Sequence, residues 1–522
     1  MLMAQILVSG LTFCYEGSYD NIFENVSFCI DTQWKLGFIG RNGKGKTTFL
    51  NLLLKKYDYE GTIKTPVFMD YFPYPVEEAR MNLDTISILE QIQPDYELWK
   101  ICRELSLLEM DAEILYRPYR TLSHGERTRV MLALLFSRDE AGQERFHLID
   151  EPTNHLDLPT REAVKDYLKS KKGFILVSHD RWLLDECVDH VLVLNRSTIE
   201  VVKGNFSTWW DNKERRDAFE KAENEKLKGE ISKLEASARR TAAWADRVES
   251  TKIGFDPEKE HDRSKDTRAY IGEKSRRMQQ RRKNLDRRQQ NAIEDKKKLL
   301  KDIEDPANLK IVPLSYHKEM YVYARDFGIS YKDRAPVVEQ VQMELKRGSR
   351  IVLRGRNGCG KSSILKAILT APGAEVLGGL SEEITETKRM LHGTLHVASG
   401  LRISYINQDT SGLRGSLDDY IEHLGADGSL FKSVLRQLDF ERVQFEKNME
   451  EYSEGQKKKV LIAGSLLQQA HLYIWDEPLN YIDIFSRMQI EELILKFQPT
   501  MLLVEHDKAF GDKVATQIIE LS

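Results

Sequence analysis

The sequence predicts an α/β chain in which two similar domains are joined by a long antiparallel α-helical hairpin. Two observations predict the domains: a glycine-rich loop occurs twice, and the same series of short apolar runs follows each copy. Such runs are typical of strands buried on both faces of a parallel sheet, and the stretches between them have helical periodicity. The third observation predicts the hairpin, because the strand-like runs give way to a charged segment with helical spacing. At 522 residues the chain can hold about three units.

The glycine-rich loop is the first element of each domain. Gly40–Thr47 reads GRNGKGKT and Gly355–Ser362 reads GRNGCGKS, so both match the P-loop pattern G-x-x-x-x-G-K-[ST]. Backbone N–H groups of a P-loop surround phosphate oxygens, while the lysine and the hydroxyl serve the terminal phosphates and Mg²⁺. The shared interior RNG argues against chance and predicts two ATP sites. The predicted ATP-binding residues in and next to the loops are Gly40, Asn42, Gly43, Gly45, Lys46, Thr47, Thr48, Gly355, Asn357, Gly358, Gly360, Lys361, Ser362 and Ser363.

A carboxylate pair and then a histidine follow each P-loop, each behind an apolar run. An isolated Asp-Glu pair is most often a solvated helix start. Here the apolar run before the pair and the duplicated P-loop favour a functional site at the end of a strand. The pairs are Asp150 with Glu151 and Asp476 with Glu477, and the histidines are His179 and His506.

These motifs, in this order, closely resemble the nucleotide-binding cassettes of ABC ATPases over residues 4–203 and 319–522. The resemblance includes a signature before each carboxylate pair, which reads LSHGE at 122–126 and YSEGQ at 452–456. In this family two cassettes face each other head to tail, so each ATP lies between the P-loop of one cassette and the signature of the other. The resemblance therefore implies that both cassettes complete each ATP site. The signature residues are Ser123, Gly125, Glu126, Ser453, Gly455 and Gln456.

The resemblance also assigns roles to the polar residues, and each role has a physical reason. Phosphoryl transfer spreads negative charge over the γ-phosphate oxygens, so catalysis consists largely of placing a water molecule and neutralising that charge. Glu151 and Glu477 would polarise the attacking water, and His179 and His506 would contact the γ-phosphate. The expected Mg²⁺ ligands are Thr47, Asp150, Ser362, Gln408 and Asp476. The aromatic residues that match the adenine-stacking position are Tyr15 and Tyr331, for which core packing is the alternative.

Three positions depart from the family pattern. The second cassette supplies Gln408, which usually contacts Mg²⁺, but Tyr74 stands at that place in the first cassette. The signatures carry His124 and Glu454 where a glycine is usual. Because the site of the first P-loop lacks the glutamine and faces Glu454, we expect the two sites to hydrolyse ATP at unequal rates.

The segment between the domains predicts the helical hairpin. Two series of residues recur at coiled-coil spacing, and Gly254 and Pro257 lie between them and should turn the chain back. Two helices of about 35–40 residues would make an arm roughly 50–60 Å long. The expected divisions are a first domain at 1–203, a hairpin at 204–318 with its tip at about 240–272, and a second domain at 319–522. The two series are Leu227, Ile231, Leu234, Ala238, Thr241 and Ala245, and then Met278, Leu285, Ala292 and Leu299.

The charge of this segment points to a polyanion. The whole chain has a net charge of −4, but residues 211–310 hold 28 Lys and Arg against 22 Asp and Glu. Basic residues pair with phosphates, and aromatic or guanidinium planes stack on exposed bases, which suits structured RNA. A solvated coiled-coil spacer is the alternative, although it needs neither the basic surplus nor the aromatics. The candidate RNA-contacting residues are Trp244, Phe255, Tyr270, Lys274, Arg276, Arg277, Arg281 and Arg282.

A basic hairpin between two fused cassettes resembles the ABC-F proteins, which bind the ribosome. That resemblance implies a partner in the bacterial 70S ribosome, with 23S rRNA and peptidyl-tRNA near the hairpin and the tRNA exit (E) site as the place of binding. Two features resemble the antibiotic-resistance members of Lsa type. The first cassette leaves little room for an inserted arm, and residues 71–74 read YFPY. Those members protect the peptidyl-transferase centre from lincosamides, pleuromutilins and streptogramin A. The alternatives are a housekeeping ABC-F translation factor and an ATPase subunit of a membrane transporter; a DNA-repair ATPase fits less well, because its coiled coil usually interrupts a cassette.

Composition limits the setting of the protein. No apolar run approaches the roughly 18 residues that cross a bilayer, and the N-terminus lacks the pattern of a signal peptide, so we expect a cytoplasmic protein without a membrane partner. The five cysteines are scattered and contain no C-x-x-C pair, which indicates neither a disulfide framework nor a zinc site. We expect the chain to act as a monomer whose two cassettes pair within the molecule.

Overall fold

The computed structural model describes residues 4–16, 21–139, 145–195, 198–253, 287, 310–331, 336–378 and 389–521, without the side chains of 238 and 241–253. The chain divides into two compact units. One unit contains both cassettes and consists of Met1–Trp209 and Pro306–Ser522. The other consists of Trp210–Asp305.

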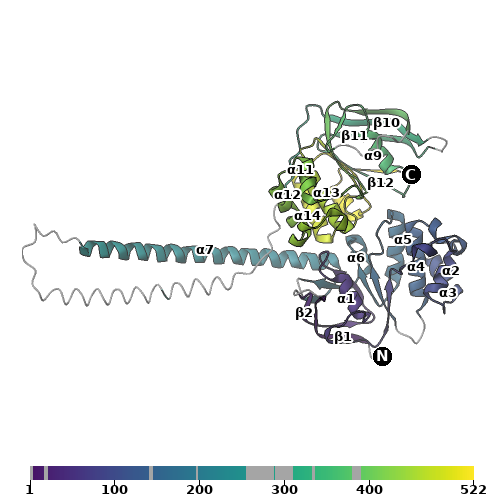
Figure 1. Cartoon of the computed structure of the whole chain (residues 1–522), viewed down its shortest axis with the longest axis horizontal. Coiled ribbons are helices and arrows are strands. Elements are labelled where there is room, and N and C mark those ends of the chain that lie inside the picture. Colours follow the sequence, from purple (N-terminus) through teal and green to yellow (C-terminus); the bar gives the residue numbers. More distant parts are fainter. Residues whose placement is uncertain are drawn as a thin grey trace, which may run out of the picture. The chain divides into compact units, whose positions relative to one another are not determined.

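The first cassette contains two sheets among its described residues, and Figure 1 shows the helices and strands that build it. A three-stranded antiparallel sheet has the order β2-β1-β4, and a six-stranded sheet has the order β5-β6-β7-β3-β8-β9, parallel except for β9. The elements are β1 Gln5–Phe13, β2 Phe23–Asp31, β3 Lys35–Ile39, α1 Lys46–Leu53, β4 Glu60–Lys64, β5 Phe68–Phe72, η1 Glu78–Arg80, α2 Thr85–Ile92, α3 Leu98–Leu107, η2 Ala112–Tyr116, η3 Tyr119–Thr121, α4 His124–Ser137, β6 Arg145–Asp150, α5 Leu158–Ser170, β7 Phe174–Val177, α6 Arg181–Cys187, β8 His190–Leu194 and β9 Ile199–Lys203.

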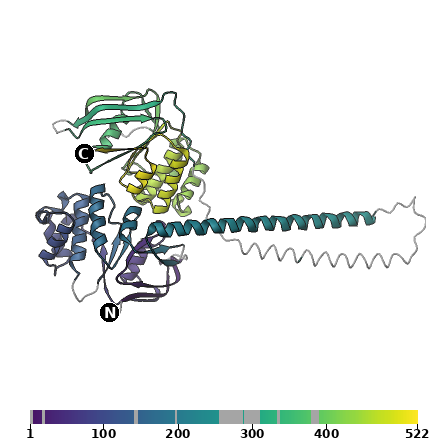
Figure 2. The same ribbon diagram turned by 180° about the vertical axis from the view of Figure 1, so that it is seen from behind.

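The second cassette repeats this plan, which Figure 2 shows from behind. Its sheets have the orders β11-β10-β14 and β13-β15-β16-β17-β12-β18, and the second of these is parallel throughout its described strands. The elements are β10 Met320–Tyr331, β11 Val338–Lys346, β12 Arg350–Gly355, α9 Lys361–Leu369, β13 Ala374–Val376, β14 Arg389–Val397, β15 Leu401–Ile406, α11 Leu417–Leu424, α12 Gly428–Gln437, η4 Arg442–Glu446, η5 Met449–Glu451, α13 Glu454–Leu467, β16 Leu472–Asp476, α14 Ile484–Phe497, β17 Met501–Val504, α15 Lys508–Val514 and β18 Gln517–Leu521.

The apolar runs of the sequence form the central strands of the two parallel sheets. β7 (FILV), β16 (LYIWD) and β17 (MLLV) are buried along their whole length, as expected for strands covered on both faces. The order β5-β6-β7-β3-β8 in one cassette matches β15-β16-β17-β12-β18 in the other. The prediction of two P-loop α/β domains is therefore confirmed, and the polar residues that follow these strands lie at one edge of each sheet.

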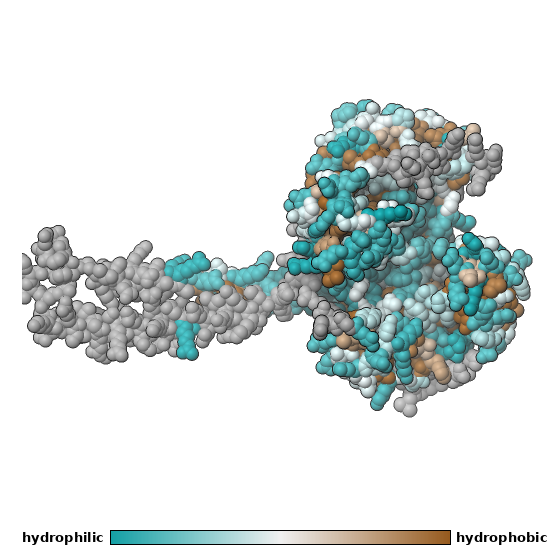
Figure 3. All heavy atoms as spheres, viewed as in Figure 1, coloured by the Kyte–Doolittle hydropathy of each residue, from teal (hydrophilic) through white to brown (hydrophobic). Residues whose placement is uncertain are grey.

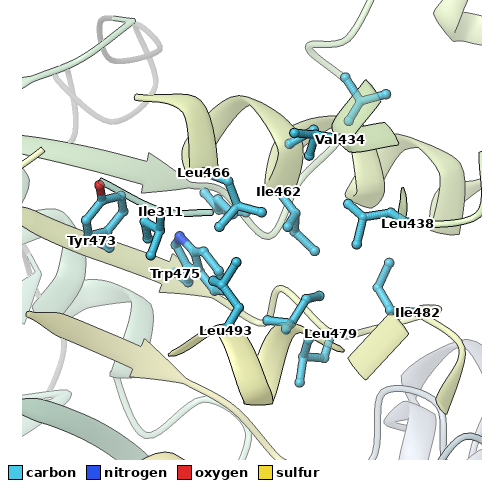
Figure 4. Close-up of a cluster of buried hydrophobic side chains, with 14 of the residues drawn as sticks. Ile311, Val434, Leu438, Ile462, Leu466, Tyr473, Trp475, Leu479, Ile482 and Leu493 are labelled. Carbon is cyan, nitrogen blue, oxygen red and sulfur yellow. The ribbon is translucent and has the colours of Figure 1, made fainter. Parts of the chain in front are cut away.

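Helices cover the second parallel sheet and bury its largest side chain. Figure 4 shows Trp475 of β16 with Ile462 and Leu466 of α13 on one side and Leu493 of α14 on the other. The indole of Trp475 is fully buried, and its Nε1–H donates a hydrogen bond to Ser465 Oγ at 2.9 Å. This packing fixes α13, whose first turn carries the signature, relative to the strand that ends at Asp476.

The helix α7 (Phe206–Ile253) follows the first cassette and is 48 residues long. It is longer than the 35–40 residues that we predicted, because its backbone continues through 241–253, where we expected the tip of the hairpin. At its start, Asn205 Oδ1 accepts a hydrogen bond from Thr208 N. Its first turn is fixed to the cassettes: Ser207 N donates to Asp185 Oδ1 at 2.7 Å, and the rings of Trp209 and Phe485 lie 6.2 Å apart. The helix ends one residue before Gly254, whereas the turn and the second helix of the predicted hairpin lie outside the described residues.

The described surface is mixed in polarity. Figure 3 shows hydrophilic residues over most of the visible face, with hydrophobic residues in small scattered groups. None of the helices in the described part of the chain is long and apolar enough to span a membrane.

Candidate functional site

Each P-loop joins a central strand to a helix. The first connects β3 to α1 and the second connects β12 to α9. Gly45 and Gly360 precede the helices at φ of 104° and 91°, and an added Cβ would lie 2.5 Å from Ile22 Cγ2 and 2.2 Å from Val338 Cγ2, respectively. Only glycine fits both the backbone conformation and the space. The loops therefore leave the first N–H groups of α1 and α9 available for a phosphate group.

The P-loop lysines curl back over their own loops. Lys46 Nζ donates to Gly40 O at 2.7 Å and to Arg41 O at 3.1 Å, and Lys361 Nζ donates to Gly355 O and Arg356 O, both at 2.9 Å. Burial lowers the pKa of Lys46, and the carboxylates of Glu151 and Asp150 oppose this effect. The two ammonium groups thus lie inside the loops that would surround the phosphates.

A hydroxyl and a carboxylate meet next to each P-loop. Thr47 Oγ1 donates to Asp150 Oδ2 at 2.9 Å, and the Ser362 hydroxyl lies close enough to Asp476 to lower the pKa of that carboxyl. Burial raises the pKa of Asp476 to about 6, and its Oδ1 is buried without a hydrogen-bond partner in the described part of the chain. An unpaired buried carboxylate oxygen beside a hydroxyl fits the ligand set of a Mg²⁺ ion that keeps several waters.

The next residue in each cassette is a glutamate with unusual backbone geometry. Glu151 and Glu477 have φ of 50° and 47°, a left-handed conformation that non-glycine residues rarely adopt. The same conformation in both cassettes turns each carboxylate away from its strand toward a histidine. His179 Nε2 lies 3.2 Å from Glu151 Oε1, and His506 Nε2 lies 3.5 Å from Glu477 Oε1.

The two glutamates differ in their surroundings. Glu477 Oε2 accepts hydrogen bonds from Gln408 Nε2 at 2.8 Å and Asn480 Nδ2 at 2.7 Å. Burial alone would raise the pKa of Glu477, but the nearby His506, the charge of Lys361 and a hydrogen bond from Asn480 outweigh it and hold the pKa below its usual value. Burial and the neighbouring Asp150 instead raise the pKa of Glu151 from 4.5 to about 8. Without nucleotide, the surroundings of Glu477 thus favour its ionised form, whereas those of Glu151 favour its protonated form.

This difference predicts a pH dependence of stability. Because the folded state binds a proton at Glu151 that the unfolded chain loses near pH 4.5, stability falls as pH rises from about 5 to about 8. We expect Glu151→Gln to make the unfolding midpoint of the nucleotide-free protein less dependent on pH in this window, as measured by denaturant titration. Glu477→Gln is the matched control and should not flatten the curve, since the pKa of Glu477 is lowered. Equal pH profiles for wild type and Glu151→Gln would contradict the prediction.

The aromatic residues predicted to stack on adenine lie next to the P-loop helices. Tyr15 and Thr48 share a hydrogen bond of 2.7 Å between their hydroxyls, and Tyr331 and Ser363 share one of 2.8 Å. Tyr15 is 42% exposed. Each tyrosine is therefore tied to the residue after the P-loop hydroxyl, and the ring of Tyr15 also contacts those of Phe13 and Tyr57.

The signatures begin two helices that have the same N-terminal cap. Ser123 Oγ accepts from Glu126 N while the Glu126 carboxylate accepts from Ser123 N, and Ser453 and Gln456 form the same capping box before α13. Glu126 and Gln456 thus fix the backbone around the two signature serines. Their role in the structure is capping.

Contacts between the cassettes bring each P-loop to the opposite cassette. Asn42 Nδ2 donates to Tyr481 O at 2.8 Å, and Asn357 Nδ2 donates to His155 O at 3.2 Å. An added Cβ on Gly455 would lie 2.6 Å from the same Tyr481 O, so the second signature and the first P-loop flank one carbonyl group. Arg41 also forms an ion pair with Asp439 at 3.0 Å.

His155 and Tyr481 are interface residues that we did not predict. Their side chains hydrogen-bond to each other across the two cassettes, and their φ angles are 61° and 63°. A sequence signal was present, since EPTNHLD at 151–157 and EPLNYID at 477–483 recur directly after the aspartates. Comparing the two halves beyond the carboxylate pair would have found them.

The departures from the family pattern have structural consequences. Tyr71, another residue that we did not predict, donates through its hydroxyl to Asp150 Oδ2 at 3.2 Å. Burial raises the pKa of Tyr74 far above its usual value, so its hydroxyl stays protonated. The imidazole of His124 lies 5.3 Å from that of His155, whereas Glu454 Oε2 accepts from Thr410 Oγ1 at 2.6 Å.

The side chains of the candidate RNA-contacting residues lie outside the described residues. The backbone of Trp244 belongs to α7, but its side chain is outside the described residues. The remaining candidates lie outside the described residues altogether: Phe255, Tyr270, Lys274, Arg276, Arg277, Arg281 and Arg282.

Comparison with known proteins identifies the family. Residues 23–154 and 338–480, which together make up more than half of the chain, match the family described as ABC transporter. Similar curated proteins include the putative ATP-binding protein YdiF of Bacillus subtilis, 27% identical over 96% of this chain and 78% of that protein. The ribosome protection protein VmlR of the same organism is 26% identical over 99% of this chain and 87% of its own length.

A solved structure supports the fold over nearly the whole chain. The chain is similar to one in a model of ribosome-bound archaeal Pelota and ABCE1, with a TM-score of 0.59 and 19% identity over 98% of this chain and 76% of that chain. At this identity the likeness shows the fold alone. The duplicated P-loops, the matched cassettes and the similarity to such relatives agree: the chain belongs to the ABC transporter family and is an ATPase of ABC-F type with two cassettes.

Proposed function

We propose that this ATPase binds the bacterial 70S ribosome at the tRNA exit (E) site when its two cassettes are closed around ATP. From there it would protect the peptidyl-transferase centre from lincosamides, pleuromutilins and streptogramin A. The similarity to a ribosome protection protein over 99% of the chain carries this proposal. The protein would act in the cytoplasm as a monomer, with 23S rRNA and peptidyl-tRNA as neighbours of its linker.

Two composite ATP sites would drive the cycle. One would combine Lys46 and Thr47 with Ser453 and Gly455 of the second signature, and contacts of Asn42 and Gly455 with Tyr481 O support this pairing. The other would combine Lys361 and Ser362 with Ser123 and Gly125. The oxygen sets around Asp150 and Asp476 would hold Mg²⁺, with Gln408 at the second, and the ion would neutralise phosphate charge.

The glutamates and histidines would act on the attacking water. Glu477 is ionised and lies within reach of Gln408, Asn480 and His506, so it can accept a proton from a water at once. Glu151 must first lose its proton, which ATP-induced closure would have to promote. We therefore expect the site of the second P-loop to hydrolyse ATP faster.

The linker would carry the effect on the ribosome. Its basic surplus suits ribosomal RNA, and its length allows it to extend beyond a cassette. Closed cassettes would fit the exit site better than open ones, and hydrolysis would release the protein. This difference in affinity would couple ATP to binding.

Drug-protection assays test this proposal directly. We expect expression of the intact chain in a susceptible bacterium to raise the inhibitory drug concentration, whereas a variant with 241–270 replaced by a short turn should still pellet with ribosomes but protect much less. Intact chain in the membrane fraction rather than with ribosomes would favour a transporter subunit. Equal protection by both forms would show that the tip has no part in resistance.

A further inference from the structure

The second cassette contains a connection between two regions that belong to different ATP sites. Gln408 Nε2 donates a hydrogen bond to Glu477 Oε2 at 2.8 Å, beside the second P-loop. Two residues later, Thr410 Oγ1 donates to Glu454 Oε2 at 2.6 Å, and Glu454 is the first residue of α13, directly after Ser453. The segment 408–410 thus touches the catalytic glutamate of one site and the signature of the other.

A buried lysine reinforces this connection. Lys458 Nζ donates to Asn407 O at 3.1 Å and to Gln408 O at 2.9 Å, and the side chain of Lys458 is almost fully buried. Lys458 lies one helical turn after Glu454, so both side chains leave the same face of α13. Together they hold the first turn of the signature helix against the backbone around Gln408.

The first cassette has different residues at the matching positions. If Ser123 is aligned with Ser453, His124 replaces Glu454 and Thr128 replaces Lys458. A threonine cannot supply an ammonium group, and the His124 ring lies beside His155. Tyr74 likewise stands in place of Gln408. The connection is therefore built with side chains that belong to the second cassette.

We propose that Thr410, Glu454 and Lys458 are positioning residues that couple the two ATP sites through the second cassette. ATP at the second P-loop would hold Gln408 in one position. The connection would in turn hold Ser453 and Gly455, which face the first P-loop, in one position. Because coupling between two binding sites is reciprocal, ATP at the first P-loop would strengthen binding at the second equally. This inference rests on the composite sites of the proposed function, but not on the ribosome as partner.

Nucleotide binding without ribosomes tests the coupling. In the Glu151→Gln/Glu477→Gln protein, which should not hydrolyse ATP, the affinity of the first P-loop for a fluorescent ATP analogue is measured with and without Lys361→Ala. We expect Lys361→Ala to weaken this affinity about 10-fold when Thr410 is present, and less than about 2-fold in a Thr410→Val protein. Thr410→Ser keeps the donor hydroxyl and should restore the larger effect, which a loss of packing alone would not explain.

The outcomes separate the possibilities. The coupling role would be overturned if Lys361→Ala changed the affinity of the first P-loop equally in the protein with Thr410 and in the Thr410→Val protein. It would also be overturned if Lys361→Ala changed this affinity in neither protein. Glu454→Ala changes a half-exposed side chain and provides a second break in the connection should Thr410→Val not fold. Ser453→Ala tests the composite site itself: an unchanged affinity at the first P-loop would refute the proposed pairing of the cassettes rather than the connection alone.

Discussion

Glu151→Gln combined with Glu477→Gln is expected to leave ATP binding intact and to lower ATP turnover by about 10²-fold or more. Glutamine keeps the size and the hydrogen-bonding oxygen of each side chain but cannot accept the proton of the attacking water. In the presence of ATP, the cassettes should then stay closed. The proposed function therefore predicts that this variant accumulates on ribosomes, as measured by co-sedimentation.

The matched controls for this experiment are the two single variants. Because the pKa of Glu477 is lowered and that of Glu151 is raised without nucleotide, we expect Glu477→Gln to remove more of the turnover than Glu151→Gln. Equal losses from the two single substitutions would argue against unequal sites. Failure of the double variant to pellet with ribosomes in ATP would refute the ribosome as partner.

Arg487→Met is expected to lower the free energy of unfolding by about 3–5 kcal/mol, because it leaves a buried carboxylate without its partner. Arg487 Nη1 lies 2.9 Å from Asp507 Oδ2, and both side chains are buried. Burial would raise the pKa of Asp507, but Arg487 outweighs it and keeps the carboxylate ionised. Denaturant unfolding of the nucleotide-free protein measures the effect.

Two controls separate charge from packing in this prediction. Arg487→Met combined with Asp507→Asn removes both charges and should recover much of the lost stability. Lys432→Met breaks a surface ion pair with Asp418, whose side chain is 70% exposed, and should cost less than about 1 kcal/mol. Similar losses for Lys432→Met and Arg487→Met would contradict the importance of the buried pair.

The sequence predicted the two cassettes because their signals are local and occur twice. A P-loop needs glycines at fixed positions, and a strand buried on both faces needs a continuous apolar run, so both can be recognised without knowledge of distant contacts. Ser123 and Ser453 can also be recognised as capping residues from the sequence, since a capping box spans only four residues.

Contacts between distant segments could not be predicted in the same way. Tyr71 reaches Asp150, and Thr410 reaches Glu454, only because neighbouring strands and a helix bring them together. The protonation of Glu151 likewise depends on burial and on the charge of Asp150, which no motif encodes. Sequence motifs named the residue types at the site, whereas packing decided their electrostatics.

The fixed first turn of α7 gives the linker a mechanical property. Ser207 N donates a hydrogen bond to Asp185 in α6 of the first cassette, while the ring of Trp209 lies next to that of Phe485 in the second. The first turn of the helix therefore contacts both cassettes. A continuous helix of 48 residues is about 70 Å long. Because Ser207 and Trp209 contact different cassettes, a rearrangement between the cassettes must either break one of these two contacts or move the first turn of α7.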